Sequence, residues 1–221
     1  MPSEESTSTL ADAATSRREL NKAATRAAIA EAAMRLLRTE GATAVTAERA
    51  ADAAGVSRRT FFNYFPTVES ALNEPTELFL EQALRQLESF PEDMPVLAAA
   101  VDAVRSLAAP RALASVAELF TLADNNPQLA RLQLESWDRC ADRLIAVFAR
   151  RAPGKPTLDI AVLAYSIVGA GKAVFGHWAA DGGGDLSDAS IAALQGNLTA
   201  AMTQLRDGFP SLNTAAATGE A

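Results

Sequence analysis

The chain has 221 residues, a formal net charge of -7 and an apolar content of 49%, so it is long enough to bury a substantial core. Aromatic residues make up only 6%, which argues against a β-sandwich and, together with the abundance of alanine, favours closely packed helices. A single cysteine (Cys140) and a single histidine (His177) exclude a disulfide framework and any zinc site that needs several such residues.

Charge is unevenly distributed along the chain. Residues 17–65 contain nine Arg and Lys against five Asp and Glu, whereas residues 66–221 contain eleven against nineteen. Residues 1–16 have neither the basic start nor the apolar stretch of a signal peptide, and their composition predicts a disordered arm. The longest apolar run, residues 160–171, is too short to span a bilayer. We therefore expect a soluble cytoplasmic protein, with no membrane partner, whose basic N-terminal third meets an anion.

The N-terminal third is predicted to contain three helices. Apolar residues at helical spacing predict the first helix over about residues 20–39. Thr46 and Ser57 are suited to cap two further short helices, and Gly55 provides the tight turn between them. Two short helices joined in this way, over about residues 46–65, have the spacing of a helix-turn-helix.

The rest of the chain continues the helical period, with prolines and glycines at the expected breaks. The segment 157–180 is apolar almost all round, so it must be covered on several sides, by its own domain and by a second subunit. No segment alternates in polarity long enough to form a strand. We therefore predict an all-α protein of about nine helices, divided into a disordered arm (1–16), a helix-turn-helix domain (17–68), a second helical domain (69–210) and a disordered tail (211–221).

One stretch of the N-terminal third carries a specific resemblance. The positions that share their order and spacing with a known family are Gly41, Thr46, Ala51, Ala54, Gly55, Val56, Ser57, Thr60, Phe61, Phe62, Tyr64, Phe65 and Pro66. With these residues the segment 29–72 resembles the DNA-binding domain of the TetR (tetracycline-repressor-like) family of bacterial transcriptional regulators. Phe62 stands where that family commonly has tyrosine and Val68 where it commonly has lysine, so two contacts to phosphate would be lost.

The resemblance implies how such a protein works. Two copies form a homodimer, and their recognition helices read the two halves of a near-palindromic operator. The last two helices pair with their copies, while helices within residues 76–180 enclose a pocket for a small-molecule effector. Effector binding then changes the spacing of the recognition helices and releases the DNA.

Candidate DNA-binding residues follow from what a recognition helix requires. Its N-terminal end enters the major groove and needs hydrogen-bond donors there. Arg58 and Arg59 occupy that end, and each can grip a guanine base with two hydrogen bonds. The resemblance adds Asn63 and Tyr64 as backbone or base contacts. The other predicted contacts to DNA are Arg17, Arg18 and Lys22 at the start of the first helix, Thr46 and Ser57 at helix N-termini, and Thr60.

Candidate pocket and interface residues lie at helical spacing in the second domain. The predicted effector-pocket residues are Phe120, Trp137, Cys140, Tyr165 and Lys172. The predicted dimer-interface residues are Val168, Phe175, Trp178, Leu194, Leu198 and Leu205. Each has a plainer alternative, because aromatic residues at such spacing commonly belong to a core and a lysine can extend to the surface.

No pattern in the sequence indicates catalysis. His177 and Asp181 lie four residues apart, but two ligands do not make a metal site. Residues 169–172 lack the first glycine and the final Ser or Thr of a phosphate-binding loop. We therefore predict a DNA-binding repressor with no cofactor and no bound metal. Two alternatives stay open: a helical ligand-binding or adaptor protein with weakened DNA binding, and a helical-bundle enzyme.

Overall fold

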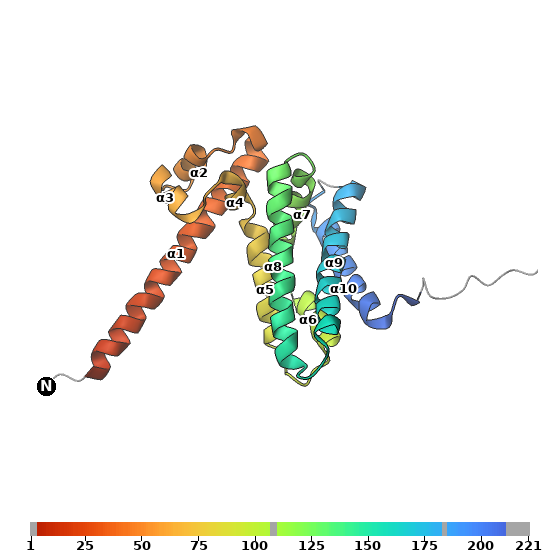
Figure 1. Cartoon of the computed structure of the whole chain (residues 1–221). Helices are drawn as coiled ribbons and strands as arrows, with labels where there is room; N and C mark the ends of the chain where they lie inside the picture. The colour runs from red at the N-terminus through yellow and green to blue at the C-terminus, as the bar shows by residue number, and fades with distance from the viewer. Residues whose placement is uncertain (1–3, 107–109, 183–184, 211–221) are drawn as a thin grey trace, which may run out of the picture. The chain divides into compact units, whose positions relative to one another are not determined.

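A computed structural model describes residues 4–106, 110–182 and 185–210, and within these ranges it contains ten α-helices, one short 3₁₀-helix and no strand (Figure 1). The elements in chain order are α1 Glu4–Glu40, η1 Ala42–Ala44, α2 Ala47–Ala53, α3 Arg58–Tyr64, α4 Val68–Leu72, α5 Glu74–Glu88, α6 Val96–Ser106, α7 Pro110–Ala123, α8 Pro127–Arg151, α9 Thr157–Gly182 and α10 Asp188–Asp207. The all-α prediction is confirmed. The predicted disordered tail, residues 211–221, lies outside the described residues.

The first helix begins earlier than the sequence predicted. Residues 4–16, which were expected to form most of a disordered arm, are the first turns of α1. Neither glycine nor proline occurs between Glu4 and Glu40, and alanine and glutamate, both strong helix formers, are frequent there. A helix that is fixed by its buried C-terminal half can therefore extend toward the N-terminus one hydrogen bond at a time.

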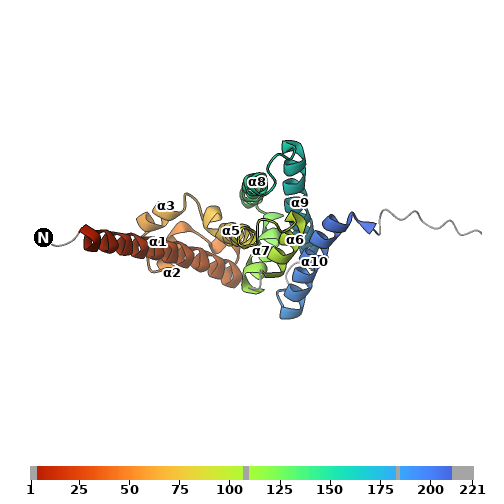
Figure 2. The ribbon, with the colours of Figure 1, turned by 90° about the horizontal axis from the view of Figure 1, so that it is seen from below.

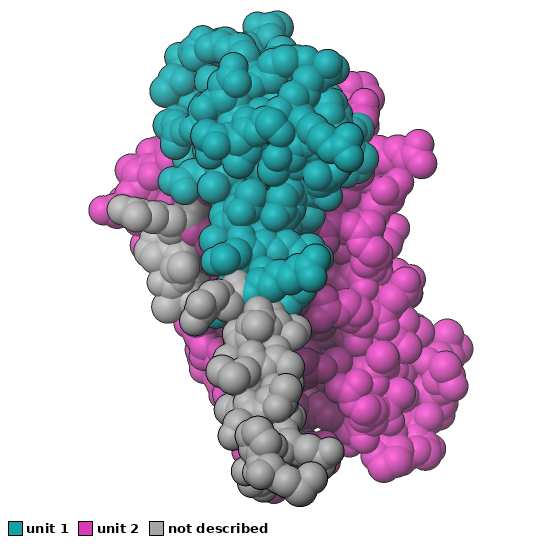
Figure 3. All heavy atoms as spheres, turned by 90° about the vertical axis from the view of Figure 1, so that its left-hand side faces the viewer, with its two compact units in different colours: residues 1–74 teal, residues 75–221 magenta. Residues whose placement is uncertain are grey.

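The helices form two compact units, Met1–Glu74 and Pro75–Ala221, coloured separately in Figure 3. The boundary falls later than the one predicted at residue 68. The reason is that α4 packs against α1 and so belongs to the first unit.

The first unit has a small core beneath the helix-turn-helix. Its largest fully buried side chains are those of Ile29, Phe61 and Phe65, and the rings of the two phenylalanines lie 6.0 Å apart. Ala50 and Ala51 of α2 are also buried, which allows α2 to approach its neighbours closely. The core therefore fixes α2 and α3 through their inner faces and leaves the outer faces free.

The second unit is a bundle of α5 to α10. The helices α8 and α9 lie side by side, and α9 also contacts α7 and α10 (Figures 1 and 2). At the centre of the bundle lies the fully buried ring of Phe175. It is surrounded by the rings of Phe79, Phe120 and Trp137, whose centroids lie 5.7, 5.2 and 5.9 Å away.

Helix α9 is the most apolar helix of the described chain. By length and composition alone, its segment Thr157–Asp181 is sufficient to cross a membrane, contrary to the expectation from the shorter apolar run. Core helices of soluble proteins have the same property, and Ile160, Ala164 and Phe175 of α9 are buried in the bundle. Only 28% of the apolar window of α9 is buried, however, so part of this apolar surface is not covered by the second unit.

Candidate DNA-binding site and effector cavity

The turn between α2 and α3 is fixed by backbone geometry. Gly55 has a φ of 69°, in the left-handed region that a residue with a side chain rarely adopts. The N–H of Val56 then donates to the carbonyl of Ala51 over 2.9 Å and closes the end of α2. This is the turn that the sequence predicted at Gly55.

Both helices of the motif begin with a capped N-terminus. The Thr46 hydroxyl accepts a hydrogen bond from the N–H of Arg49 (3.2 Å), and the Ser57 hydroxyl accepts one from the N–H of Thr60 (3.0 Å). The Ser57 and Thr60 hydroxyl oxygens also lie 2.8 Å apart. Thr46 and Ser57 therefore hold the start of each helix in place, a role they can fulfil whether or not they also touch DNA.

Helix α3 has one buried face and one exposed face. Phe61 is fully buried, whereas Arg58, Arg59, Phe62 and Asn63 are exposed. The exposed side chains include both arginines at the N-terminal end of the helix, where a recognition helix enters the major groove. Of the other predicted contacts on α3, Thr60 and Tyr64 are half-buried.

The two arginines of α3 have different surroundings. The Nε atom of Arg58 lies 2.8 Å from a carboxylate oxygen of Glu48 on α2, and its guanidinium lies over the ring of Phe62, 5.4 Å from the centroid. Arg59 makes no ion pair within the described part of the chain. Glu48 was not among the predicted site residues, because nothing in the sequence shows that a residue of α2 faces one of α3. Its carboxylate holds Arg58 in one orientation.

The predicted contacts on α1 lie on its exposed surface. Arg18 and Lys22 are both exposed, while the side chain of Arg17 lies outside those described. Val68, at the lysine position of the family pattern, is the half-buried first residue of α4 and supplies no cation there.

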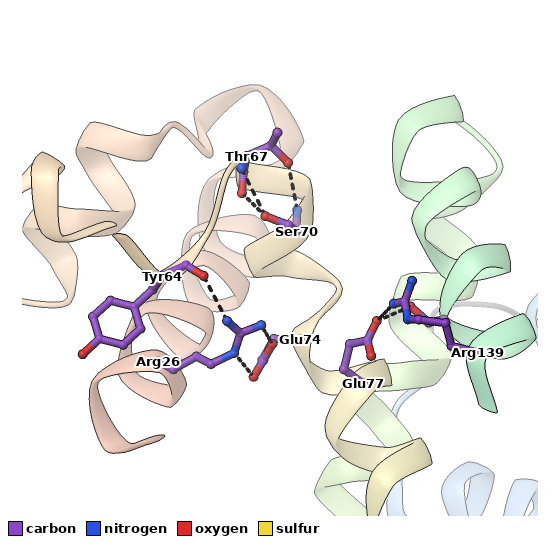
Figure 4. Close-up of polar contacts among 8 residues, drawn as sticks. Arg26, Tyr64, Thr67, Ser70, Glu74, Glu77 and Arg139 are labelled. Atoms are coloured by element: carbon purple, nitrogen blue, oxygen red, sulfur yellow. Dashed lines mark hydrogen bonds and ion pairs between the residues drawn. The ribbon is translucent and has the colours of Figure 1, made fainter. Parts of the chain in front are cut away.

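A second residue that the sequence did not single out is Arg26 of α1 (Figure 4). Its guanidinium donates two hydrogen bonds of 2.6 Å to the carboxylate of Glu74 and one of 2.9 Å to the carbonyl of Tyr64. It also lies over the ring of Phe65, 4.3 Å from the centroid. The Glu74 side chain is only 5% exposed, so this pair is the buried link between α1, the end of α3 and the start of α5.

Hydrogen bonds also fix the segment after α3. Thr67 and Ser70 form a reciprocal capping box at the start of α4 (Figure 4). Three residues after Glu74, Glu77 accepts hydrogen bonds from Arg139 and Ser136 of α8. The first turn of α5 therefore carries two acidic residues, one held by α1 and the other by α8.

The second unit encloses an apolar cavity of about 80 Å³. Residues of α5, α6, α8, α9 and α10 line it, and two of them, Trp137 and Cys140, are among the predicted pocket residues. Burial raises the pKa of the Cys140 thiol to about 11, so the thiol is uncharged at neutral pH. Most of the wall consists of aliphatic residues, which the sequence could not distinguish from ordinary core: Leu80, Leu84, Leu87, Val104, Leu144, Ile167, Leu198 and Met202.

The other three predicted pocket residues lie elsewhere. Phe120 stacks on Phe175 and meets Trp137 edge-on, outside the lining of the cavity. Tyr165 is 50% exposed on the surface of α9. Lys172 is half-buried beside the lining residue Gly171 but does not itself line the cavity.

Most of the predicted dimer-interface residues face the interior of the second unit. Those in its core are Val168, Phe175, Trp178, Leu194 and Leu198, whereas Leu205 is half-buried. The exposed apolar residues of α9 are instead Leu158, Val162 and Tyr165, which are 71%, 57% and 50% exposed. Because α9 is apolar on several sides, the sequence pattern could not tell its inner face from its outer one.

The histidine of the chain lies beside an aspartate on the surface of α9. The Nε2 atom of His177 lies 3.1 Å from a carboxylate oxygen of Asp181, one helical turn later, and both side chains are mostly exposed. No group of three or more His, Cys, Asp and Glu side chains that could hold a metal ion occurs among the described residues.

The first unit carries a capped helix with two exposed arginines at its N-terminal end, and the second unit is a helical bundle with a cavity. Together these features define a DNA-binding transcriptional regulator of the helix-turn-helix class. Residues 29–70 match the family model described as bacterial regulatory proteins of the tetR family. The resemblance read from the sequence is confirmed for this segment, and over most of its length the chain is similar to solved TetR-family regulators.

Solved structures of TetR-family regulators are also similar to the chain. A TetR-family repressor from Thermus thermophilus, FadR in complex with lauroyl-CoA, is 26% identical over 89% of this chain and 99% of its own, with a TM-score of 0.52. A TetR-family regulator from Mesorhizobium loti (19% identity, 86% and 96% coverage, TM-score 0.53) and FadR from Bacillus halodurans (21%, 82% and 96%, 0.52) share the fold. None of the curated proteins compared with the chain matches it.

Proposed function

We propose that this regulator is a cytoplasmic homodimeric repressor that releases its operator when a small molecule occupies the cavity of the second unit. The observation that supports DNA binding most strongly is the exposed face of α3, where both arginines lie at the end that enters the groove. The acidic balance of the whole chain does not oppose this, because the basic residues are concentrated in the first unit.

Arg59 is the principal base-reading residue in this proposal. Its guanidinium is exposed and free of ion pairs among the described residues, so it can meet a guanine without first breaking a contact. Arg58 reads a second base in the orientation that Glu48 and Phe62 give it. Arg18 and Lys22 contact flanking phosphates, and Asn63 and Tyr64 contact the backbone or a base beside the arginines.

The homodimer forms through α9 and α10. Leu158, Val162 and Tyr165 follow one another at helical spacing and place an exposed apolar stripe on α9, which a second copy would cover. The buried predicted residues, such as Leu194 and Leu198, contribute indirectly by fixing α10 against the bundle. A symmetric dimer presents two recognition helices, as a near-palindromic operator requires.

The size of the cavity supports a mechanism of release. At about 80 Å³ it is smaller than ligand pockets, which commonly measure about 300–1,000 Å³. An effector must therefore separate the lining helices, and it binds better to the arrangement in which they are apart. Lauroyl-CoA bound to the Thermus thermophilus repressor is consistent with an effector that has a long apolar part.

The test begins with DNA fragments selected by the purified protein from a random pool. Mobility-shift titrations then compare the unmodified chain with the double variant Arg58→Ala, Arg59→Ala. Each lost two-pronged base contact is worth about 1–3 kcal/mol, so we expect at least a thirtyfold loss of affinity. The control is Arg85→Ala, Arg105→Ala, which removes the same charge from the second unit. Equal affinity of both double variants would show that α3 does not read the operator through these arginines.

A further inference from the structure

The wall of the cavity in the second unit contains no charged side chain. Its lining residues include no Asp, Glu, Lys, Arg or His. The acidic residues of α5 next to these wall residues already have partners: Glu77 is bound by Arg139 and Ser136, Glu81 by Arg85 and Glu88 by Arg150. A ligand that carried a full charge into this cavity would lose its hydration and find no partner of opposite charge.

One residue of the wall nevertheless carries a polar group without a partner among the described residues. The Trp137 side chain is 3% exposed, and its indole Nε1–H donates to no acceptor in the described part of the chain. The same is true of the side-chain amide nitrogen of Gln133, which lies one helical turn earlier on α8 and is 4% exposed. Buried donors without acceptors are rare in native proteins, and each calls for an explanation.

The second tryptophan of the chain provides the contrast. Trp178 is also buried, but its Nε1–H donates to the hydroxyl of Ser190 over 3.0 Å. Of the two tryptophans, the one that lines the cavity is therefore the one whose N–H lacks an acceptor among the described residues.

The position of the Trp137 ring is fixed by a glycine on the opposite helix. A Cβ atom at Gly171 of α9 would lie 3.3 Å from Cζ3 of Trp137, which is tighter than most such contacts. Phe120 and Phe175 hold other parts of the ring, with centroid distances of 6.0 and 5.9 Å. The indole ring of this cavity-lining residue is thus held in a defined position rather than mobile.

We propose that the cavity takes an uncharged, mostly hydrocarbon ligand that carries an oxygen acceptor such as an ester, ketone or amide carbonyl, and that Trp137 donates its N–H to that oxygen. The aliphatic wall receives the hydrocarbon part. This inference names the ligand class of the proposed effector site, so its regulatory meaning rests on the proposed function.

The first test uses three probes of matched chain length on the unmodified full-length protein. Isothermal titration calorimetry measures binding of methyl octanoate, octanoate and octyltrimethylammonium. We expect the neutral ester to bind at least tenfold more tightly than either ion. Octanoate or the ammonium ion binding as tightly as the ester, or no binding of the ester, would overturn the proposal.

The second test addresses the hydrogen bond itself. Trp137→Phe removes the donor and should weaken ester binding roughly three- to tenfold, whereas the matched control Trp178→Phe should leave it unchanged. Equal affinity of Trp137→Phe and the unmodified chain would overturn the role of this donor. If Trp137→Phe does not fold, as judged by circular dichroism, the infrared carbonyl stretch of the ester bound to the unmodified protein tests the hydrogen bond instead. It falls to lower frequency if the oxygen accepts a hydrogen bond and stays at its position in hydrocarbon if it does not.

Operator binding is measured in parallel without any probe. A protein that binds methyl octanoate but no selected DNA would retain the ligand inference and lose the proposed function. A protein that binds its operator but not the ester would retain the proposed function and lose the ligand inference.

Discussion

At the scale of single residues, the guanidinium of Arg26 contacts three residues of the first unit, Glu74, Tyr64 and Phe65. It donates hydrogen bonds to the buried carboxylate of Glu74 and to the Tyr64 carbonyl at the end of α3, and it lies over the face of the Phe65 ring. Its partner is almost fully buried, but Arg26 itself is 41% exposed, which reduces the strength of the pair through solvent screening.

Replacement of Arg26 by alanine should therefore lower the free energy of unfolding by about 2–3 kcal/mol, because Glu74 loses its only cation among the described residues. Urea denaturation followed by circular dichroism measures the loss. Arg18→Ala, on the exposed part of the same helix, is the control and should change stability by less than about 0.5 kcal/mol. Equal stability of the two variants would mean that the Arg26–Glu74 pair contributes nothing net.

At the scale of elements, α5 is the helix through which the chain passes from the first unit to the second. It begins with Glu74, which α1 holds, and Glu77 one turn later is held by Arg139 and Ser136 of α8. Ser136 adjoins the cavity residue Trp137, so a ligand that displaces α8 also displaces the partners of Glu77. We therefore expect any coupling between the cavity and operator binding to run along α5, the helix in which the chain passes from one unit to the other.

Glu77→Gln should weaken the coupling through α5 while leaving both the cavity and the DNA-binding surface intact. We expect the operator affinity of the free protein to stay within about threefold, while the loss of affinity caused by methyl octanoate becomes smaller, because the neutral amide binds Arg139 less strongly than a carboxylate does. Mobility-shift titrations with and without the ester measure both quantities. The control, Glu81→Gln, breaks a pair within α5 itself (Glu81 with Arg85) and should leave the response unchanged. An unchanged response in Glu77→Gln would place the coupling elsewhere.

The elements also show what the sequence could and could not predict. Caps at Thr46 and Ser57 and the turn at Gly55 are local features, set by hydrogen bonds within five residues, so the helix-turn-helix was predicted correctly. The two faces of α9 were not distinguished, because apolar residues occur on both sides and only tertiary packing decides which is covered. Glu48 and Glu74 were missed for the same reason, since each finds its arginine on another helix.

At the scale of the whole molecule, the proposed dimer should depend on the exposed stripe of α9. Tyr165→Glu places a charge in the middle of a surface that a second copy would cover, so we expect dissociation to monomers and loss of operator binding. Analytical ultracentrifugation measures the mass. Leu134→Glu changes an equally exposed apolar residue of α8, where Leu134 is 51% exposed and Tyr165 is 50%, and should remain dimeric. A dimeric Tyr165→Glu protein would exclude this face of α9 as the interface.

The charge of the whole molecule sets the final prediction. A net charge of -7 repels DNA at a distance, yet the residues that would meet phosphate belong to the basic segment 17–65. Each phosphate neutralised releases counterions, so the logarithm of operator affinity should fall linearly with the logarithm of salt concentration. Lys22→Ala should reduce that slope by about 1 for each copy of the chain, while Lys155→Ala, in the exposed loop after α8, should leave it unchanged. A slope near zero would indicate that cations of the basic segment do not neutralise phosphates, and it would overturn the assignment of Lys22 as a phosphate contact.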